Sequence, residues 1–442
     1  MKKKLLPLVL VSAILAGTLA GCTGGSQASN TAAAPSAAPS AAAPSSSAVE
    51  SSSSAPAENV TLNFAIWDDK QEKGLRTIAD DFEAANPGIK IKISVTGWDS
   101  YWTMLEAGAT GGSLPDVFWM HSNEIYRYGS NGMLLDLTDR ISKTDKFKLS
   151  DYPDGLVKIY NINGKQYAVP KDYDTIGLWY NKTLFDKAGI KYPDDTWTWD
   201  TLYNAAKKLT KNGVYGFLAP LHNQEGFYNF IYQNNGKVIS DDKKKSGYDD
   251  PATIEAMEYY TRFMKEKLSP QIFGDKERGE AMKNGLCAMG LFGSWNLSDF
   301  TSNEFMAKNF DVAVLPQGKT RATIYNGLGN AISANTKHPE EAWKFVEYLS
   351  TKDAQEKQAK LGVAISAYNG AADLWVNSNK TFHVKSFIDM VQYAKIRPYS
   401  NKTMAWEDKA YETLKPCFTG QQTVKQACEN TAKMMNEALA AE

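Results

Sequence analysis

Aromatic rings and carboxylates stand close together at several places in this sequence. Trp67 is followed directly by Asp68 and Asp69, and Asp172 and Asp174 lie two residues apart in a segment with an extended pattern. Because successive side chains of a strand point to opposite faces, these last two carboxylates share one face. A flat ring offers a surface for stacking, and a carboxylate accepts several hydrogen bonds. This combination predicts non-covalent binding of a polar ligand.

Other chemistries are not indicated. The four histidines show no pair at three- or four-residue spacing, and there is no C-x-x-C motif, so we expect no metal. No P-loop, glycine-rich phosphate loop or G-x-S-x-G elbow occurs either, and we expect no cofactor and no enzymatic activity. Lys and Arg number 49 against 50 Asp and Glu, a balance that gives no reason to expect nucleic acid as a partner.

The first 58 residues do not have a globular composition. Lys2 to Lys4 precede an apolar run over residues 5–19, which is typical of a secretory signal and too short for a permanent membrane span. Residues 19–22 resemble a bacterial lipobox, and this resemblance implies cleavage before Cys22 and attachment of lipid to its sulfur. The alternative is an ordinary signal peptide, in which Cys22 has no special role. Residues 23–58 contain 12 Ala, 11 Ser and 4 Pro, which predicts a disordered linker.

The other three cysteines are Cys287, Cys417 and Cys428. An exported protein can form disulfides, and Cys417 and Cys428 flank a turn at residues 419–421 between two helical patterns. A bridge between them and three separate buried thiols are both compatible with the sequence.

The remaining 384 residues suffice for two packed lobes, and they begin with alternating strands and helices. Residues 60–66, 89–95 and 116–119 have strand patterns, with helical patterns between them, the first ending at Asn86-Pro87-Gly88. This order predicts a parallel α/β sheet, whose strand ends would place Trp67 and Trp119 along one rim.

The later segments continue this pattern. Residues 167–180 are extended, and short apolar runs at 287–292 and 310–315 are of strand type. We expect one helix that is capped by Thr198 and ends at residue 209. Further helices are expected over residues 251–267, 339–349, 406–414 and 423–439.

In its ordered motifs, the chain resembles the extracellular sugar-binding lipoproteins of ABC importers, extracellular solute-binding family 1, which includes maltose-binding protein. The motifs include Asn86-Pro87-Gly88, Leu114-Pro115-Asp116, Trp179-Tyr180-Asn181-Lys182 and Gly293-Ser294-Trp295. Together the matching segments span residues 82–89, 111–119, 167–170, 179–182, 187–190, 198–200, 289–295, 342–345 and 420–424, in order across the folded part.

The resemblance implies a two-lobe, type II periplasmic-binding-protein-like α/β fold with the ligand cleft between lobes joined by crossing hinge strands. The crossings are expected near Asp172, residues 325–327 and residues 366–369. The N-terminal lobe would then hold residues 59–171 and 328–366, and the C-terminal lobe residues 172–327 and 367–442.

The resemblance also marks residues that would hold a sugar. Trp295 matches a family tryptophan that stacks on the sugar ring, Asp174 matches an acidic cleft residue, and Trp406 matches a late stacking tryptophan. Ser122 departs from an acidic position of maltose-binding protein, which weakens any expectation of maltose. The expected ligand-binding set is Trp67, Asp68, Asp69, Trp98, Trp119, His121, Asp172, Asp174, Trp295, Tyr325, Asn326, Gly327, Arg397, Tyr399 and Trp406.

We therefore expect a monomeric receptor, lipid-anchored through Cys22 on the outer side of the cell membrane. By the resemblance it would capture an oligosaccharide by hinge closure and deliver it to ABC permease and ATPase subunits. One alternative is a lipid-anchored glycoside hydrolase, which needs two carboxyl groups facing one bond; nothing in the sequence singles out such a pair. Another is a receptor for a peptide or polyamine.

Overall fold

The computed structural model describes residues 59–442. The expected signal segment, Cys22 and the linker lie outside the described residues. The first sheet has five strands in the order β2 (Ile89–Val95), β1 (Val60–Ile66), β3 (Val117–His121), β12 (Leu328–Ile332) and β6 (Ala168–Pro170). Both β2 and β3 run parallel to β1, as the order of the first elements predicted, whereas β12 is antiparallel to both its neighbours.

Helix α1 shows how local sequence builds this sheet's cover. It spans Asp69–Ala85 and begins where the Asp68 carboxylate accepts a hydrogen bond from the Lys70 N–H. Leu75, Ile78, Ala79 and Phe82 are buried at helical spacing, so this stripe packs toward the sheet. Gly88, at a φ of 99°, then turns the chain into β2. The carboxylate that caps the helix therefore sits at the end of β1.

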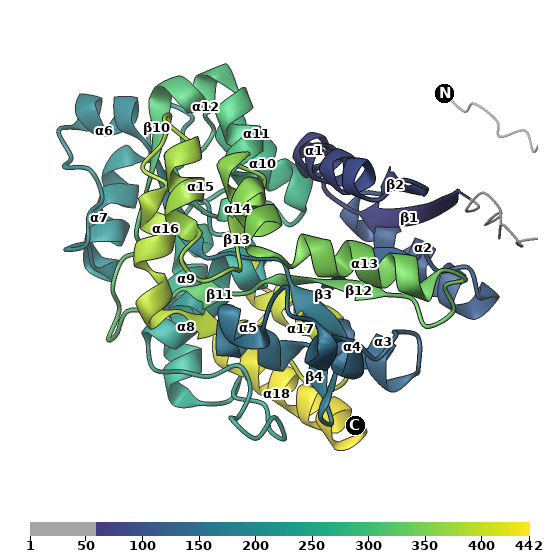
Figure 1. Ribbon diagram of the computed structural model, residues 1–442. Coiled ribbons are helices and arrows are strands. Elements are labelled where there is room, and N and C mark those ends of the chain that lie inside the picture. The colour runs from purple at the N-terminus through teal and green to yellow at the C-terminus, as the bar shows by residue number, and fades with distance from the viewer. Residues whose placement is uncertain (1–58) are drawn as a thin grey trace, which may run out of the picture. The chain divides into compact units, whose positions relative to one another are not determined.

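The other elements of this part follow the same logic. Helix α13 (Pro339–Leu349), with the bounds that the sequence predicted, lies against β12 and β1 (Figure 1). The remaining elements are α2 (Trp98–Gly111), α3 (Ile125–Ser130), α4 (Thr138–Lys143), η1 (Leu149–Asp151), α5 (Asp154–Ile159), β4 (Asn161–Ile162), β5 (Lys165–Gln166) and α14 (Lys352–Lys360).

A second sheet has three antiparallel strands in the order β10 (Phe310–Ala313), β8 (Ile176–Asn181) and β9 (Met289–Gly293). Strand β8 is the middle strand, and all six of its residues are buried. The ring of Trp179 is covered by the rings of Phe300 and Phe382. Strand β9 leads directly into the short turn η3 (Ser294–Asn296), which carries Trp295.

Helices surround this second sheet. Helices α17 (Thr403–Phe418) and α18 (Val424–Ala440), yellow in Figure 1, pack against each other and against α9 (Pro251–Lys265). The others are α6 (Lys182–Ala188), α7 (Trp199–Leu209, capped by Thr198 as expected), the π-helical turn η2 (Asn223–Phe227), α8 (Tyr228–Gln233), α10 (Asp275–Lys283), α11 (Leu297–Ser302), α12 (Glu304–Asn309), α15 (Ala372–Ser378), α16 (Lys385–Asp389) and η4 (Val391–Tyr393).

Two short ribbons lie at the expected crossings. Strand β7 (Asp172–Tyr173) pairs with β13 (Ile365–Ser366), and β11 (Ile324–Tyr325) pairs with β14 (Lys395–Ile396). The first three were expected near these positions, whereas β14 was not. The residue bounds of the two lobes remain a prediction, although each sheet draws on the segments expected for one lobe.

Of the two arrangements that the sequence left open for Cys417 and Cys428, the structure has separate thiols. Both are free thiols, as is Cys287, and all three are buried. Cys417 and Cys428 belong to the hydrophobic core, where they fill space as small apolar side chains. Burial raises the pKa of Cys287 and of Cys417 to about 12, so neither forms a reactive thiolate at neutral pH.

We therefore predict three free thiols in a purified chain of residues 59–442. A thiol reagent should label almost none of them in the folded protein and three after unfolding, because burial alone protects them. A reductant should leave the thermal midpoint unchanged. Labelling of a single thiol after unfolding without reductant would show that two cysteines are bridged.

Candidate ligand-binding site

A cavity of about 1000 Å³ lies among the ends of β1 and β3, the crossing ribbons, η2, η3 and α17. Nine residues of the set expected from sequence line it, which brings together side chains more than 300 positions apart in the chain. They are Trp67, Asp68, Asp69, Trp98, His121, Asp172, Asp174, Trp295 and Arg397.

Six expected residues do not line the cavity. Trp119 is fully buried, with the Lys171 ammonium 4.1 Å above its ring, and Trp406 is buried with its Nε1–H donating to Ser400 Oγ at 2.8 Å. The expectation for these two tryptophans was therefore wrong: each fills the core one layer behind the cavity wall.

The other four support the wall from behind or lie away from it. Tyr325 is buried against the ring of Tyr173, and the ring of Tyr399 is covered by the Lys243 ammonium at 3.2 Å. Gly327 lies so close to the carbonyl of Asp172 that a Cβ there would overlap it. Asn326 is fully buried, and it acts on the site through His121.

His121 is held as a neutral ring. Its Nδ1 donates to Asn123 Oδ1 at 2.6 Å, and its Nε2 accepts from Asn326 Nδ2 at 2.7 Å. Burial and the nearby Arg397 guanidinium lower the pKa of His121 to about 3, because both disfavour the imidazolium. A neutral ring has one donor for the Asn123 oxygen and one acceptor for the Asn326 N–H. His121 also lines the cavity, where its ring is part of an aromatic surface.

Trp67 and Trp98 form an aromatic wall together with this ring. Their rings contact each other edge to face at 5.1 Å, and the Trp98 ring lies 5.3 Å from His121. Behind them, Trp67 contacts Tyr101 at 5.0 Å and Trp119 at 5.0 Å. Edge-to-face packing of this kind holds the two half-buried rings in fixed orientations.

Trp295 faces the cavity from the second sheet and keeps 38% of its surface exposed, a large fraction for a tryptophan. Its ring folds back over Gly293, where a Cβ would overlap it. The Gly293 N–H donates to Glu225 Oε1 at 2.6 Å, and Asn296 Nδ2 donates to the same oxygen at 2.8 Å. Glu225 therefore holds both sides of the turn that presents this tryptophan.

Glu225 comes from the π-helical turn η2, and its side chain is only 2% exposed. Its other oxygen accepts from Arg278 Nη2 of α10 at 2.6 Å. In η2, Gly226 adopts a φ of −156° and a ψ of −119°, outside the helical region, and its Cβ would meet the hydroxyl of Tyr260. No sequence pattern marked this turn, because its residues follow neither the helix nor the strand period.

A second buried ion pair lines the cavity. Arg397 donates from Nη2 to Glu407 Oε2 at 2.5 Å, and both side chains are almost fully buried. Asp174 accepts from Gln224 Nε2 at 2.9 Å. The pKa of the Asp174 carboxyl is raised well above its usual range, because the group is buried and because Asp172 and Glu225 lie near it.

The sequence analysis expected only Trp406 of α17 in the cleft and missed the residues of this helix that line it. One face of this helix lines the cavity, at the helical spacing that a surface stripe requires. The lining residues of the helix are Met404, Glu407, Asp408, Tyr411, Glu412 and Lys415. A mixed acidic and aromatic stripe at three- and four-residue spacing was the signal that could have found them.

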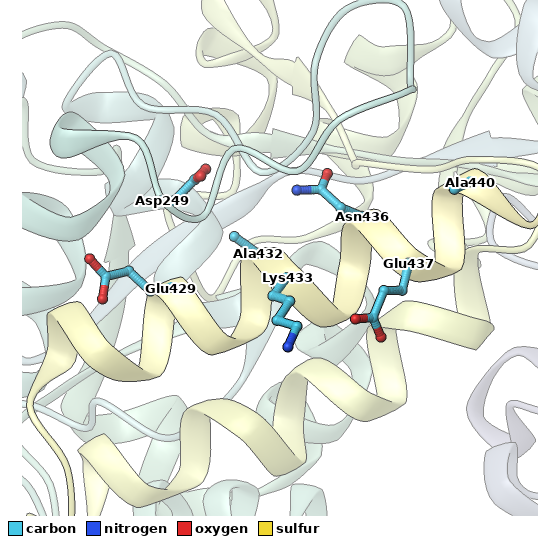
Figure 2. A pocket seen from close by; sticks show the side chains of 7 residues that line it. All are labelled: Asp249, Glu429, Ala432, Lys433, Asn436, Glu437 and Ala440. Carbon is cyan, nitrogen blue, oxygen red and sulfur yellow. The ribbon is translucent and has the colours of Figure 1, made fainter.

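A second hollow on α18 differs in kind (Figure 2). Its lining contains no aromatic ring, and most of it comes from one helix. The residues are Asp249, Glu429, Ala432, Lys433, Asn436, Glu437 and Ala440. It offers no surface for stacking, which leaves the larger cavity as the candidate site.

Within residues 59–442 no group of three or more His, Cys, Asp or Glu is placed to hold a metal ion. Within the same range no helix has the length and apolar character that crossing a membrane requires.

Comparison with known proteins agrees with this architecture. Among solved structures, an ABC substrate-binding protein from Listeria monocytogenes in complex with cycloalternan superposes with a TM-score of 0.79 at 25% identity, covering 86% of this chain and 99% of that one. The Multiple sugar-binding protein of Streptococcus mutans is 25% identical over 331 residues, which cover 69% of this chain and 74% of that protein.

The Galactooligosaccharide-binding protein of Bacillus subtilis is 24% identical over 324 residues, which cover 70% of this chain and 72% of that protein. A family model described as bacterial extracellular solute-binding protein matches residues 68–356, well over half of the chain. This chain therefore belongs to the family of bacterial extracellular solute-binding proteins, and it has their two-lobe α/β fold with a cleft between lobes joined by crossing strands.

Proposed function

We propose that this protein captures an oligosaccharide in the cavity and delivers it to the permease of an ABC importer. The observation that carries the proposal is one cavity in which exposed faces of Trp67, Trp98 and Trp295 meet a wall rich in carboxylates and amides. A sugar has C–H faces that stack on rings and hydroxyl groups that donate and accept hydrogen bonds. The two kinds of surface in the cavity match the two kinds on a sugar.

The size of the cavity favours more than one sugar ring. Ligand cavities usually measure about 300 to 1000 Å³ for drug-sized molecules. At about 1000 Å³, this cavity stands at the upper end of that range and suits a ligand larger than a single hexose. The names of relatives point the same way, since they include a galactooligosaccharide-binding protein and a structure that contains cycloalternan.

Trp67 and Trp98 would hold one face of the sugar and Trp295 another, while Asp68, Asp172 and Asp174 accept from its hydroxyl groups. Capture at a micromolar Kd corresponds to about −8 kcal/mol. A few stacked rings and several charge-assisted hydrogen bonds can provide this binding free energy. They also offset the entropy lost when the ligand is immobilised and the lobes stop moving. The ligand would then favour the closed arrangement of the lobes, to the extent that it binds that arrangement more tightly.

The proposal includes the partners and location that the sequence suggested. Permease and ATPase subunits would receive the sugar, because the family serves ABC transporters. Lipid attachment at Cys22 would hold a monomeric receptor at the outer side of the cell membrane, and it rests on the resemblance of residues 19–22 to a lipobox.

The first test is thermal melting of residues 59–442 against neutral mono- and oligosaccharides, with each sugar recovered afterwards. A ligand at 100 times its Kd adds about 2.7 kcal/mol to the free energy of unfolding, so its midpoint shift is readily detected. We expect an oligosaccharide to raise the midpoint and to be recovered intact. Recovery of cleaved sugar would indicate a hydrolase, and a shift with peptides or polyamines alone would indicate a different receptor.

Substitution of the exposed tryptophan tests the stacking surface. Trp295→Ala should weaken binding of the best oligosaccharide at least tenfold, or about 1.4 kcal/mol, because one ring face is lost. The midpoint of the empty protein should hardly change, because Trp295 is 38% exposed. Phe305→Ala is the matched control, since Phe305 is 39% exposed but does not line the cavity. Equal effects of the two substitutions on affinity would contradict the assignment.

A double-mutant cycle tests the role of Glu225 in orienting Trp295. Glu225→Gln should weaken binding about fivefold and lower the thermal midpoint, because Arg278 loses its buried carboxylate. In a Trp295→Ala background the same change should not weaken binding further, because no ring remains to be oriented. Glu280→Gln, which alters an exposed ion pair on the same helix as Arg278, is the control. Additive losses would mean that Glu225 contacts the ligand itself.

A further inference from the structure

Lys171 is a buried cation at the first crossing, behind the wall of the cavity. Its side chain is 1% exposed, and it is not among the residues that line the cavity. The ammonium donates to Asp172 Oδ2 and, at 3.5 Å, to Gln71 Oε1, and it lies 4.1 Å above the ring of Trp119. Three N–H groups therefore have three partners, which come from β7, α1 and β3.

The backbone of Lys171 is held as well. Its N–H donates to the carbonyl of Leu328 at 2.8 Å, and its carbonyl accepts from Gln358 Nε2 at 2.8 Å. Leu328 begins β12 and Gln358 belongs to α14, so two further elements fix the position of this residue. Because the ammonium is buried and fully partnered, it can affect a ligand only through the residues that it contacts.

Gln71 connects this ammonium to a carboxylate of the cavity. Its Oε1 accepts from Lys171, and its Nε2 donates to Asp68 Oδ2 at 2.8 Å. The reverse orientation of the amide would place its NH₂ group against the ammonium and its oxygen against the carboxylate, and both contacts would be repulsive. The charge of Lys171 therefore determines that Gln71 donates to Asp68.

Both oxygens of Asp68 act as acceptors. Oδ1 accepts from the Lys70 N–H at 2.9 Å, and Oδ2 accepts from Gln71. A proton on either oxygen would compete with one of these donors, whereas an ionised carboxylate has about four acceptor sites and can accept further hydrogen bonds. Asp68 is half-buried and lines the cavity, so a hydroxyl group of a ligand can donate to it.

The groups around Asp68 oppose the effect of its burial. Burial raises the pKa of the Asp68 carboxyl, whereas the hydrogen bonds from Gln71 and Lys70 and the charge of Lys171 act to lower it. Asp69 acts to raise this pKa, but Asp69 is exposed and pairs with the Lys70 ammonium at 3.4 Å. Loss of Gln71 or of the Lys171 charge should therefore let Asp68 take up a proton at higher pH.

We propose that Lys171 is a positioning residue, which acts through Gln71 to keep Asp68 an ionised acceptor for ligand hydroxyl groups. This Lys171–Gln71–Asp68 relay rests on the proposed function as a carbohydrate receptor, because hydroxyl groups are the donors that Asp68 would meet. In a purely structural role, Lys171 would only pair with Asp172 and support the crossing. The relay makes affinity fall as pH falls through the titration of Asp68, since a protonated carboxyl has fewer acceptor sites.

The state of Asp68 can be measured without a ligand. Carbon NMR of protein labelled at the aspartate carboxyl carbons follows its titration, and loss of the signal in Asp68→Asn identifies it. Gln71→Met removes both amide contacts at similar volume and leaves the ion pair of Lys171 and Asp172 intact. The pKa of Asp68 should rise by about half a pH unit or more in this variant, because a donor to the ionised form is lost.

Gln358→Met is the matched control. It also removes a buried amide that contacts Lys171, but this amide contacts the carbonyl and not the ammonium. The pKa of Asp68 should therefore stay unchanged. A shift as large as that in Gln71→Met would mean that general loosening of the crossing is the cause, and it would overturn the relay.

Lys171→Gln provides a second variant, since it keeps an amide that can donate to Gln71 but removes the charge. It should raise the pKa of Asp68 in the same direction as Gln71→Met. An unchanged titration in both variants would leave Lys171 with a structural role only. The thermal midpoint of each empty variant shows whether the fold is retained, and Gln71→Met decides the question if Lys171→Gln does not fold.

Binding then tests whether a sugar uses this carboxylate. The probe is whichever of maltotriose, cellotriose, mannotriose and galactotriose raises the thermal midpoint most, and its Kd is measured by titration calorimetry between about pH 4.5 and 7.5. Affinity should fall as pH falls, and in Gln71→Met the same fall should occur about half a pH unit higher.

Each other outcome of the binding experiment has a definite meaning. A loss of affinity in Gln71→Met by the same factor at every pH would mean that Gln71 only contacts the sugar, and it would overturn the proposal. If none of the four sugars binds, the proposed function fails, and the role of Asp68 toward a sugar fails with it. The NMR titration decides separately whether Lys171 and Gln71 control the charge of Asp68.

Discussion

The geometry of the cleft depends on the hydrogen bonds that the buried carboxylate of Glu225 accepts. A buried carboxylate is stable only when its oxygens receive hydrogen bonds, and Glu225 obtains them from Arg278 on α10, from the Gly293 N–H at the end of β9 and from Asn296. These bonds tie the π-helical turn η2 to the turn that carries Trp295. The exposed ring is therefore placed by a charge behind the wall, and the missing side chain at Gly293 lets the ring fold back over its own strand.

Buried ion pairs recur around the cavity. Lys171 with Asp172 lies at the first crossing, Arg278 with Glu225 behind Trp295, and Arg397 with Glu407 in the wall formed by α17. Removal of one partner from such a pair typically costs about 3 to 5 kcal/mol, whereas a hydrophobic pair of similar volume is often no less stable. Stability therefore does not explain these pairs. The pairs are better explained by orientation. Each ion pair holds a polar group at a set position in a cavity that must recognise a polar ligand.

Local pattern predicted the elements well where one physical cause acted alone. Thr198 caps α7 and Pro339 begins α13, because a helix end needs a side-chain acceptor or a residue without an N–H. Prediction was poorer where a side chain's direction depended on packing. Trp406 was expected in the cleft, but α17 turns that ring toward Ser400 and presents Asp408 and Tyr411 instead. Neighbouring positions on a helix differ by about 100°, so an error of one or two residues in phase exchanges core and site.

The alternation of strands and helices, the fold class and the kinds of side chain available for binding could be predicted from the amino-acid sequence, because these follow from period, capping and composition. The sequence also indicated, through the ends of β1 and β3 and the resemblance of Gly293-Ser294-Trp295, where much of the cleft would be found. The folded structure was needed to show which rings reach the cavity, that Asp174 and Arg397 both line it, and that Glu225 takes part at all. The reason is physical: these relations join residues distant in the chain through buried charges, whose partners no local pattern identifies.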